Sequence, residues 1–88
     1  ALERAALPGS DIEAVVLGQV VQAGSKMNPA RQAMIGAGIP ESVPALTVNR
    51  VCGSGAQAIV SAAQEVMLGH IACAVAGGME NMDQAPYL

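Results

Sequence analysis

The chain has 88 residues, of which 52% are hydrophobic, and it carries a formal net charge of −3. Its four basic residues are scattered and no apolar run approaches the roughly 18 residues that cross a bilayer, which argues against nucleic-acid binding and against a membrane span. The length allows one small domain, and two cysteines without a secretory signal favour a reducing, intracellular setting over a disulfide scaffold.

The first half of the chain predicts a helix, a strand and a second helix. Residues 1–7 are typical of the end of a helix, which Pro8-Gly9 closes. Residues 14–18 form a short, uninterrupted apolar run (Ala-Val-Val-Leu-Gly) that is typical of a buried parallel strand. Asn28 and Pro29 match an N-cap followed by proline at the first helical position, and the helix that they begin is expected to run to about residue 37.

The second half predicts a strand, a tight turn, a helix and a third strand. Residues 44–51 favour the strand, residues 52–55 (Cys-Gly-Ser-Gly) the turn, and residues 72–76 the third strand. Helical spacing predicts a helix from Ala56 to about Leu68. The apolar positions with this spacing are Ile59, Val60, Ala63, Val66 and Met67. Strands that alternate with helices indicate an α/β layer with at least these three strands parallel.

Cys52 is the candidate functional residue, because it lies where a predicted strand gives way to a predicted helix. Unpaired N–H groups and the positive end of the dipole at a helix start stabilise a thiolate. Gly53 and Gly55 are expected to leave room for a substrate that approaches the sulfur. The residues alone fit a structural cysteine in a tight turn equally well. A phosphate-binding loop is poorly supported, because neither G-x-G-x-x-G nor a Walker pattern occurs.

Three stretches of the chain resemble thiolases of the acetyl-CoA acetyltransferase type. Residues 49–58 (Asn-Arg-Val-Cys-Gly-Ser-Gly-Ala-Gln-Ala) resemble the segment that carries the nucleophilic cysteine. Residues 16–33 resemble the second strand and the helix after it. Residues 76–82 and 84–87 resemble the strand and loop beyond the nucleophile helix, whereas Asp83 departs from the family pattern, which has a small residue there. The resemblance covers essentially the whole chain and implies a thiolase-like α/β fold, here a partial N-terminal half with three strands alternating with helices.

The resemblance also implies an activity. The implied activity is that of an acyl-CoA C-acetyltransferase, which forms or cleaves 3-oxoacyl-CoA through an acyl group carried on Cys52. A thiol suits thioester exchange because it is both a soft nucleophile and a leaving group. The backbone N–H of Cys52 would help to bind the oxyanion. Coenzyme A thioesters are the implied substrates, with no cofactor and no metal. The implied parent is a homo-oligomer, a dimer or tetramer with a contact around residues 45–60, in the cytoplasm or, in a eukaryote, a mitochondrion or peroxisome.

The same resemblance implies that residues 1–88 are an incomplete N-terminal domain. The first strand of the family has no match in the chain, and neither has the C-terminal domain with its Gly-His-Pro, Cys-x-Gly and Asn-Glu-Ala-Phe segments. His70 is expected at the far end of the helix from Cys52, as a solvated or capping side chain, and Cys73 as a structural cysteine in an apolar strand. We therefore expect the parent to be an enzyme and the 88 residues alone to be inactive.

Two other interpretations are open at this point. A relative of the β-ketoacyl synthases would share the fold and the cysteine nucleophile, although the Asn-Arg-Val-Cys-Gly-Ser-Gly string favours a thiolase. A non-catalytic piece that packs on itself or on a partner chain would cover the exposed edges of a three-stranded sheet.

In the thiolase interpretation, Glu80 is expected to hold the loop under the nucleophile. Arg31 and Arg50 are expected to pair with local carboxylates or line an interface rather than bind CoA phosphates.

Overall fold

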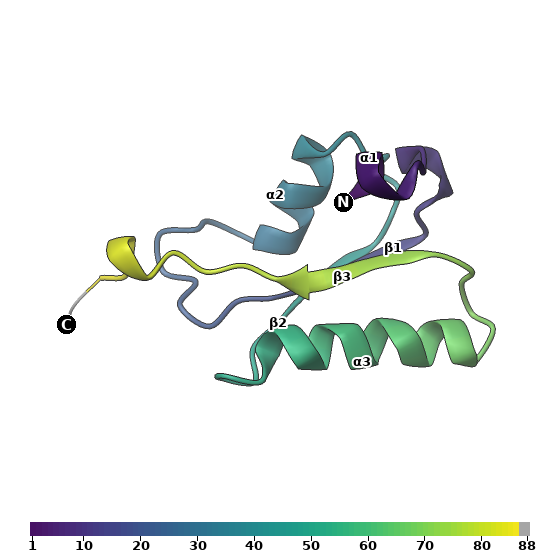
Figure 1. Ribbon diagram of the computed structural model, residues 1–88. Coiled ribbons are helices and arrows are strands. Elements are labelled where there is room, and N and C mark those ends of the chain that lie inside the picture. The colour runs from purple at the N-terminus through teal and green to yellow at the C-terminus, as the bar shows by residue number, and fades with distance from the viewer. Residues whose placement is uncertain (87–88) are drawn as a thin grey trace.

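The computed structural model describes residues 1–86, and Figure 1 shows them as a three-stranded sheet between two layers of helix. All strand pairings are parallel and the spatial order is β2-β1-β3, so the α/β class predicted from the sequence is confirmed. The strands are β1 (Ala14–Gly18), β2 (Ala45–Val48) and β3 (Ala74–Gly78). The helices are α1 (Leu2–Ala5), α2 (Pro29–Gly36) and α3 (Ser54–Met67), with short 3-10 turns η1 (Gly9–Asp11) and η2 (Met82–Gln84).

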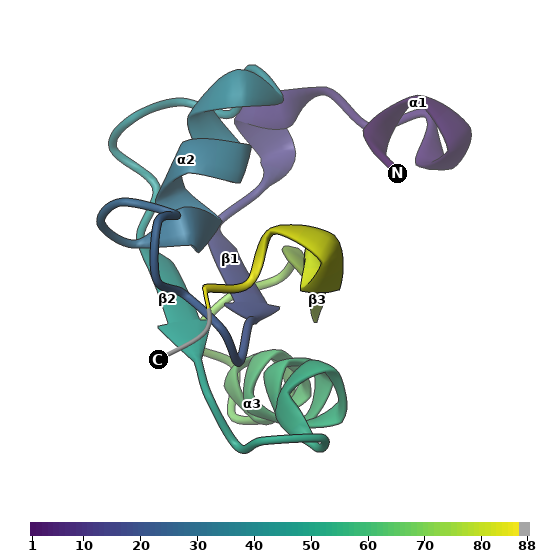
Figure 2. The same cartoon turned by 90° about the vertical axis from the view of Figure 1, so that its left-hand side faces the viewer.

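The central strand β1 is apolar along its length because it is covered on both faces. Figure 2 shows α2 on one side of the sheet and α3 on the other. Val15 packs with Met34 of α2 in one buried cluster, and Val16 packs with Ala58 and Ala62 of α3 in a second. A strand between two helical layers needs no polar face, which is why residues 14–18 form a continuous apolar run.

The start of α2 is attached to β2 through two polar side chains. The Asn28 side chain caps the helix by accepting the N–H of Arg31 at 3.4 Å and donates through Nδ2 to the carbonyl of Ala45 at 3.1 Å. Thr47 Oγ1 donates to Asn28 Oδ1 at 2.7 Å and accepts the N–H of Ala30 at 3.0 Å. The predicted N-cap is confirmed, and it also fixes α2 on the sheet.

Two strands differ from their predicted bounds. β2 ends at Val48 rather than residue 51, because the chain turns at Asn49, whose side chain accepts the N–H of Val51. β3 spans Ala74–Gly78 rather than residues 72–76. The N–H of Ala72 donates to the carboxylate of Glu13 instead of to a strand carbonyl, and regular pairing with β1 starts at Ala74.

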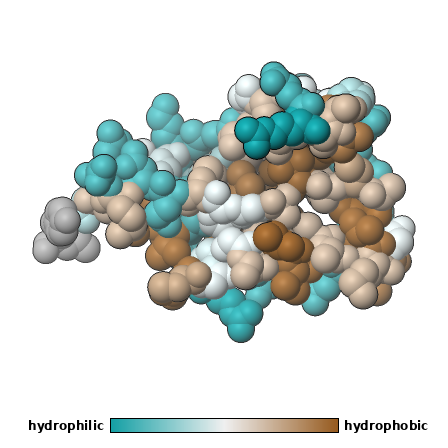
Figure 3. Space-filling model, viewed as in Figure 1, coloured by the Kyte–Doolittle hydropathy of each residue, from teal (hydrophilic) through white to brown (hydrophobic). Residues whose placement is uncertain are grey.

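Helix α3 begins at Ser54, two residues before the predicted Ala56, and buries a different face from the one that its large side chains suggested. Its buried residues are Ser54, Ala58 and Ala62, so small side chains let the helix approach the sheet closely. The large apolar residues are exposed: 56% for Ile59, 48% for Val60, 42% for Val66 and 83% for Met67. Figure 3 shows apolar side chains at the surface in the region of α3. The helical period was correct, but the large side chains do not form the core.

In the part of the chain that the structure describes, no helix has the length and apolar character that a membrane span requires.

Candidate active site at the Cys52 turn

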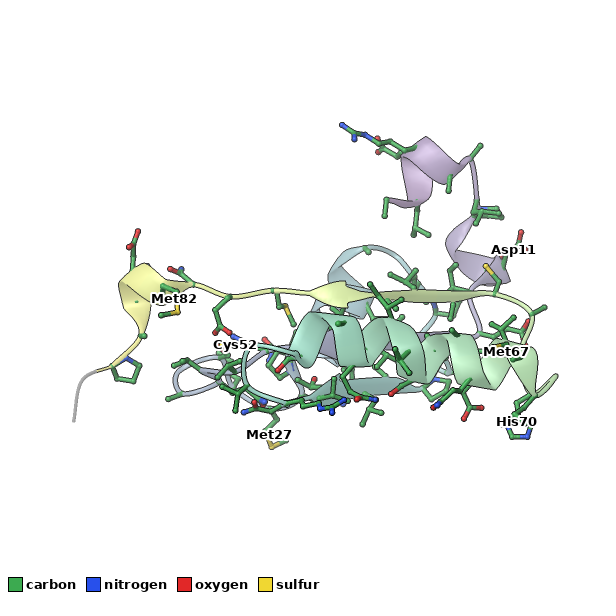
Figure 4. All side chains as sticks on the ribbon, turned by 60° about the horizontal axis from the view of Figure 1, so that its bottom comes forward. Asp11, Met27, Cys52, Met67, His70 and Met82 are labelled. Carbon is green, nitrogen blue, oxygen red and sulfur yellow. The ribbon has the colours of Figure 1, made fainter. Side chains whose placement is uncertain are left out.

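The segment 49–54, called the Cys52 turn below, joins the carboxyl end of β2 to the amino end of α3. Figure 4 shows Cys52 beside that end of the helix, and its thiol is free and exposed. It lies in a shallow hollow of about 390 Å³ at the carboxyl edge of the sheet. The hollow is lined by Val20, Val51, Cys52, Ser54, Gly55, Gly78, Met79 and Glu80. The cysteine is therefore placed where open α/β sheets bind ligands.

The Cys52 turn depends on an unusual backbone conformation at Val51. Its φ is 47°, in the left-handed region that β-branched residues rarely adopt, and such a conformation costs about 1–3 kcal/mol. Hydrogen bonds on both sides of the residue offset this cost. The N–H of Val51 donates to Asn49 Oδ1 at 3.0 Å, and its carbonyl accepts Ser54 Oγ at 2.6 Å and the N–H of Ser54 at 3.1 Å.

Ser54 fixes the turn from inside. Its side chain is 5% exposed, and its Oγ accepts the N–H of Arg50 at 2.8 Å while donating to the carbonyl of Val51. The hydroxyl thus joins the first and third peptide units of the turn, and it acts both as a donor and as an acceptor. The sequence predicted a turn here but assigned Ser54 no function in it.

Glycines bring the start of α3 against the sheet. A Cβ on Gly18 would lie 2.4 Å from the carbonyl carbon of Ser54 and 2.7 Å from the nitrogen of Gly55, both backbone atoms. A Cβ on Gly55 would point at Gly78 Cα, 3.9 Å away, and one on Gly53 at the carbonyl oxygen of Arg50, 3.4 Å away. Both distances are ordinary van der Waals contacts, and Gly55 also lines the hollow that contains Cys52, so the expectation that Gly53 and Gly55 leave room for a substrate stays a prediction. Gly18, which the sequence did not single out, allows the closest approach.

Glu80 holds the loop after β1, as the resemblance implied. Its Oε1 accepts the N–H of Val20 at 2.9 Å and its Oε2 accepts the N–H of Val21 at 3.0 Å. The N–H of Met79, the residue before Glu80, donates to the carbonyl of Gly18 at 2.9 Å, which also joins the ends of β1 and β3. Both carboxylate oxygens are engaged with backbone amides, which is the geometry of a structural carboxylate.

The other candidate residues lie away from Cys52 or bind elsewhere. His70 is at the opposite end of α3, where its Nδ1 is 2.9 Å from Glu65 Oε2 and the pair is exposed to solvent (Figure 4). Cys73 is partly buried against the Val15 cluster, just before β3. The placement of His70 agrees with the prediction from the sequence, whereas Cys73 lies just outside the strand in which it was predicted and is only partly buried.

Within the described residues, neither Arg31 nor Arg50 pairs with a carboxylate, which contradicts one of the two expected placements, while an interface position stays a prediction. The guanidinium of Arg50 donates to Gln57 Oε1 at 2.7 Å, and that of Arg31 donates to the backbone carbonyl of Glu41 at 3.2 Å.

Within residues 1–86, no group of three or more His, Cys, Asp or Glu side chains is arranged to hold a metal ion.

Comparison with known proteins identifies the family. The family model described as "Thiolase, N-terminal domain" matches residues 1–88. The chain belongs to the thiolase family. It is 52% identical over 88 residues to an acetyl-CoA acetyltransferase of Cupriavidus necator and 48% identical over 88 residues to a mitochondrial acetyl-CoA acetyltransferase of Danio rerio. All of the chain is covered in both cases, but it spans only 22% and 21% of these relatives.

Solved thiolase structures have the same fold. The crystal structure of a thiolase from Ascaris suum in complex with coenzyme A superimposes with a TM-score of 0.96 at 42% identity, over 100% of this chain and 23% of that one. The acetyl-CoA acetyltransferase of Bacillus anthracis superimposes with a TM-score of 0.92 at 40% identity, over 100% and 22%. The resemblance seen in the sequence is confirmed at the level of family and fold, and the thiolase interpretation is supported over a β-ketoacyl synthase.

Proposed function

We propose that the chain is the nucleophile-bearing part of an acyl-CoA C-acetyltransferase, and that Cys52 carries the acyl group. The observation that carries this proposal is the exposed thiol of Cys52, held in the hollow at the carboxyl edge of a thiolase-family sheet. The relatives named acetyl-CoA acetyltransferase and the coenzyme A complex of the Ascaris thiolase support coenzyme A thioesters as substrates.

The proposed chemistry is two acyl transfers. The Cys52 thiolate attacks the carbonyl of an acyl-CoA, forms a thioester on the sulfur, and releases CoA as its thiolate. A base then removes a proton from the carbon next to the carbonyl of acetyl-CoA. That carbon attacks the acyl-enzyme, which gives 3-oxoacyl-CoA and returns the Cys52 thiolate. Both half-reactions exchange a thioester bond for another bond to the same acyl carbon, so neither calls for a redox cofactor or a metal.

Residues 1–88 do not contain every group that this cycle needs. The one histidine of the chain, His70, lies at the far end of α3, and the carboxylate of Glu80 is bound to two backbone amides. We therefore propose that the proton transfers use residues of the rest of a thiolase, and that the 88 residues alone do not turn over acetoacetyl-CoA.

The test places residues 1–88 in the matching position of the Cupriavidus necator enzyme, in a hybrid called the graft below. We expect the graft to cleave acetoacetyl-CoA and to accumulate an acetyl group on the peptide that contains Cys52, detected by mass spectrometry. Cys52→Ser should lower kcat about 10³-fold or more, because the nucleophile is lost. Cys73→Ser is the matched control and should retain activity. An active Cys52→Ser graft, or turnover by the 88-residue chain alone, would contradict the proposal.

A homo-oligomer is the second part of the proposal. Four large apolar side chains between residues 45 and 60 are exposed, at 53% for Leu46, 65% for Val51, 56% for Ile59 and 48% for Val60. This is the segment that the resemblance implied as a subunit contact. Sedimentation of the chain over a range of concentrations should show association, and a concentration-independent monomer would argue against it.

The cellular location is also proposed rather than observed. Cys52 and Cys73 both carry free thiols, which is consistent with a reducing, intracellular compartment, such as the cytoplasm or a mitochondrion. The Danio rerio relative is named as mitochondrial.

A further inference from the structure

The side chain of Asn49 connects the Cys52 turn to the opposite wall of the hollow. Its Oδ1 accepts the N–H of Val51 at 3.0 Å, and its Nδ2 donates to the carbonyl of Val20 at 3.1 Å. Asn49 directly follows β2, whereas Val20 lies beyond the end of β1. A single amide therefore spans two loops that are 29 residues apart in the chain.

We propose that Asn49 is a positioning residue for acyl transfer at Cys52, which it serves by holding Val51 in its left-handed conformation. This inference rests on the proposed function of Cys52, whereas the hydrogen bonds of Asn49 are present whatever that function is. Val51 is 65% exposed, so packing does little to hold its backbone, whose φ of 47° is unfavourable for a β-branched residue. Ser54 binds the carbonyl side of Val51, and Asn49 is the group that binds its N–H.

The consequence for Cys52 follows from its place in the chain. It is the next residue after Val51, so any change in the Val51 backbone angles moves the sulfur relative to the hollow. A misplacement of about 1 Å at a reacting atom can cost about 10²-fold in rate. Holding both peptide units of Val51 therefore sets where the sulfur meets a thioester carbonyl.

The other wall of the hollow is held by the same chain of contacts. The carbonyl of Val20 accepts from Asn49, while the N–H of Val20 donates to Glu80. Val20 and Glu80 both line the hollow that contains Cys52. Asn49 thus fixes the turn relative to the loop facing it, in addition to fixing the conformation of the turn.

The first test measures hydrogen exchange in the 88-residue chain by NMR. Asn49→Ala should speed exchange of the Val51 amide about three- to tenfold, because its acceptor is lost, while the amide of Val16 in β1 should keep its rate. Asn81→Ala is the matched control, because the Asn81 side chain makes no cap contact and lies outside the hollow. An unchanged Val51 rate in a folded Asn49→Ala chain would contradict the proposal.

A second variant covers the case in which Asn49→Ala does not fold. Asn49→Asp keeps an acceptor for the N–H of Val51 and removes the donor to Val20. We expect Val51 to stay protected in this variant, whereas the loop that contains Val20 and Val21 exchanges faster. If the Val51 amide lost its protection in Asn49→Asp, the acceptor at Asn49 would not be what holds it.

The catalytic test uses the graft. Asn49→Ala should lower kcat about 10- to 100-fold with KM changed less than about twofold, because only the position of the sulfur is altered. Adding Val51→Gly should restore most of kcat, since glycine adopts positive φ without steric cost. A purely structural function for Asn49 predicts no rescue, because glycine favours the unfolded chain. Failure of the rescue would therefore refute the proposal. An inactive unsubstituted graft would refute the proposed function instead, and the exchange results would still decide whether Asn49 holds Val51.

Discussion

Among the glycines of the chain, an added Cβ would lie nearest to other atoms at Gly18, which predicts a large effect from one methyl group there. Gly18 is buried at the end of β1, and its φ lies outside the left-handed region, so alanine meets no backbone strain there. Its Cβ would nevertheless lie 2.4 Å and 2.5 Å from the carbonyl carbon and oxygen of Ser54 and 2.7 Å from the nitrogen of Gly55. These are main-chain atoms at the start of α3, so the added methyl group fits only if the backbone shifts.

Overpacking of this kind costs about 1–3 kcal/mol. With a urea dependence of about 1 kcal/mol per M, the low end for small proteins, Gly18→Ala should lower the unfolding midpoint by about 1–3 M. Circular dichroism is the suitable probe, because the chain has no tryptophan and one tyrosine.

Gly36→Ala is the matched control for this substitution. Gly36 is the last residue of α2, and nothing lies within 4 Å of its added Cβ. Alanine in a helix is favoured over glycine by about 0.5–1 kcal/mol, so the midpoint should rise. The same chemical change should therefore shift stability in opposite directions at the two sites. A Gly18→Ala chain that unfolds at or above the midpoint of the unsubstituted chain would refute the reasoning.

Two further predictions concern the turn and the core. Ser54→Ala should cost about 1–3 kcal/mol in urea unfolding, because the N–H of Arg50 loses its acceptor and the carbonyl of Val51 loses a donor. An unchanged midpoint would show that water replaces the hydroxyl. Met34→Ala should lower the free energy of unfolding by about 2–5 kcal/mol, because Met34 is 1% exposed. Ile35→Ala is the control and should lower it by less than about 1 kcal/mol, because Ile35 is 45% exposed. Equal losses of stability would mean that the core is not centred on Met34.

The sequence was sufficient for the elements whose signals are local. Residues 14–18 match β1, and Asn28-Pro29 begins α2, because an apolar run and an N-cap are properties of neighbouring residues. Helical spacing also located α3. It failed to identify the buried face, since close packing on a sheet selects small residues such as Ala58 and Ala62, and these carry little hydrophobic signal.

The features of the site that were missed are contacts between distant segments. Gly18 meets Ser54 across 36 positions of the chain, and nothing in the residues around Gly18 indicates that a helix start will lie there. The left-handed backbone of Val51 was also not predictable from local preference, because valine disfavours it. Cys52 could be placed correctly from its position between strand and helix, but the atoms that hold it there could not.

The hydrogen bonds that hold the Cys52 turn have a consequence for protein engineering. They use Asn49, Arg50, Val51, Gly53 and Ser54, and none of them involves the side chain of Cys52. The frame of the turn is therefore independent of the group that it displays. Serine, alanine or selenocysteine at position 52 should be presented in the same geometry, so that the reactivity of the side chain can be varied while its placement is kept constant.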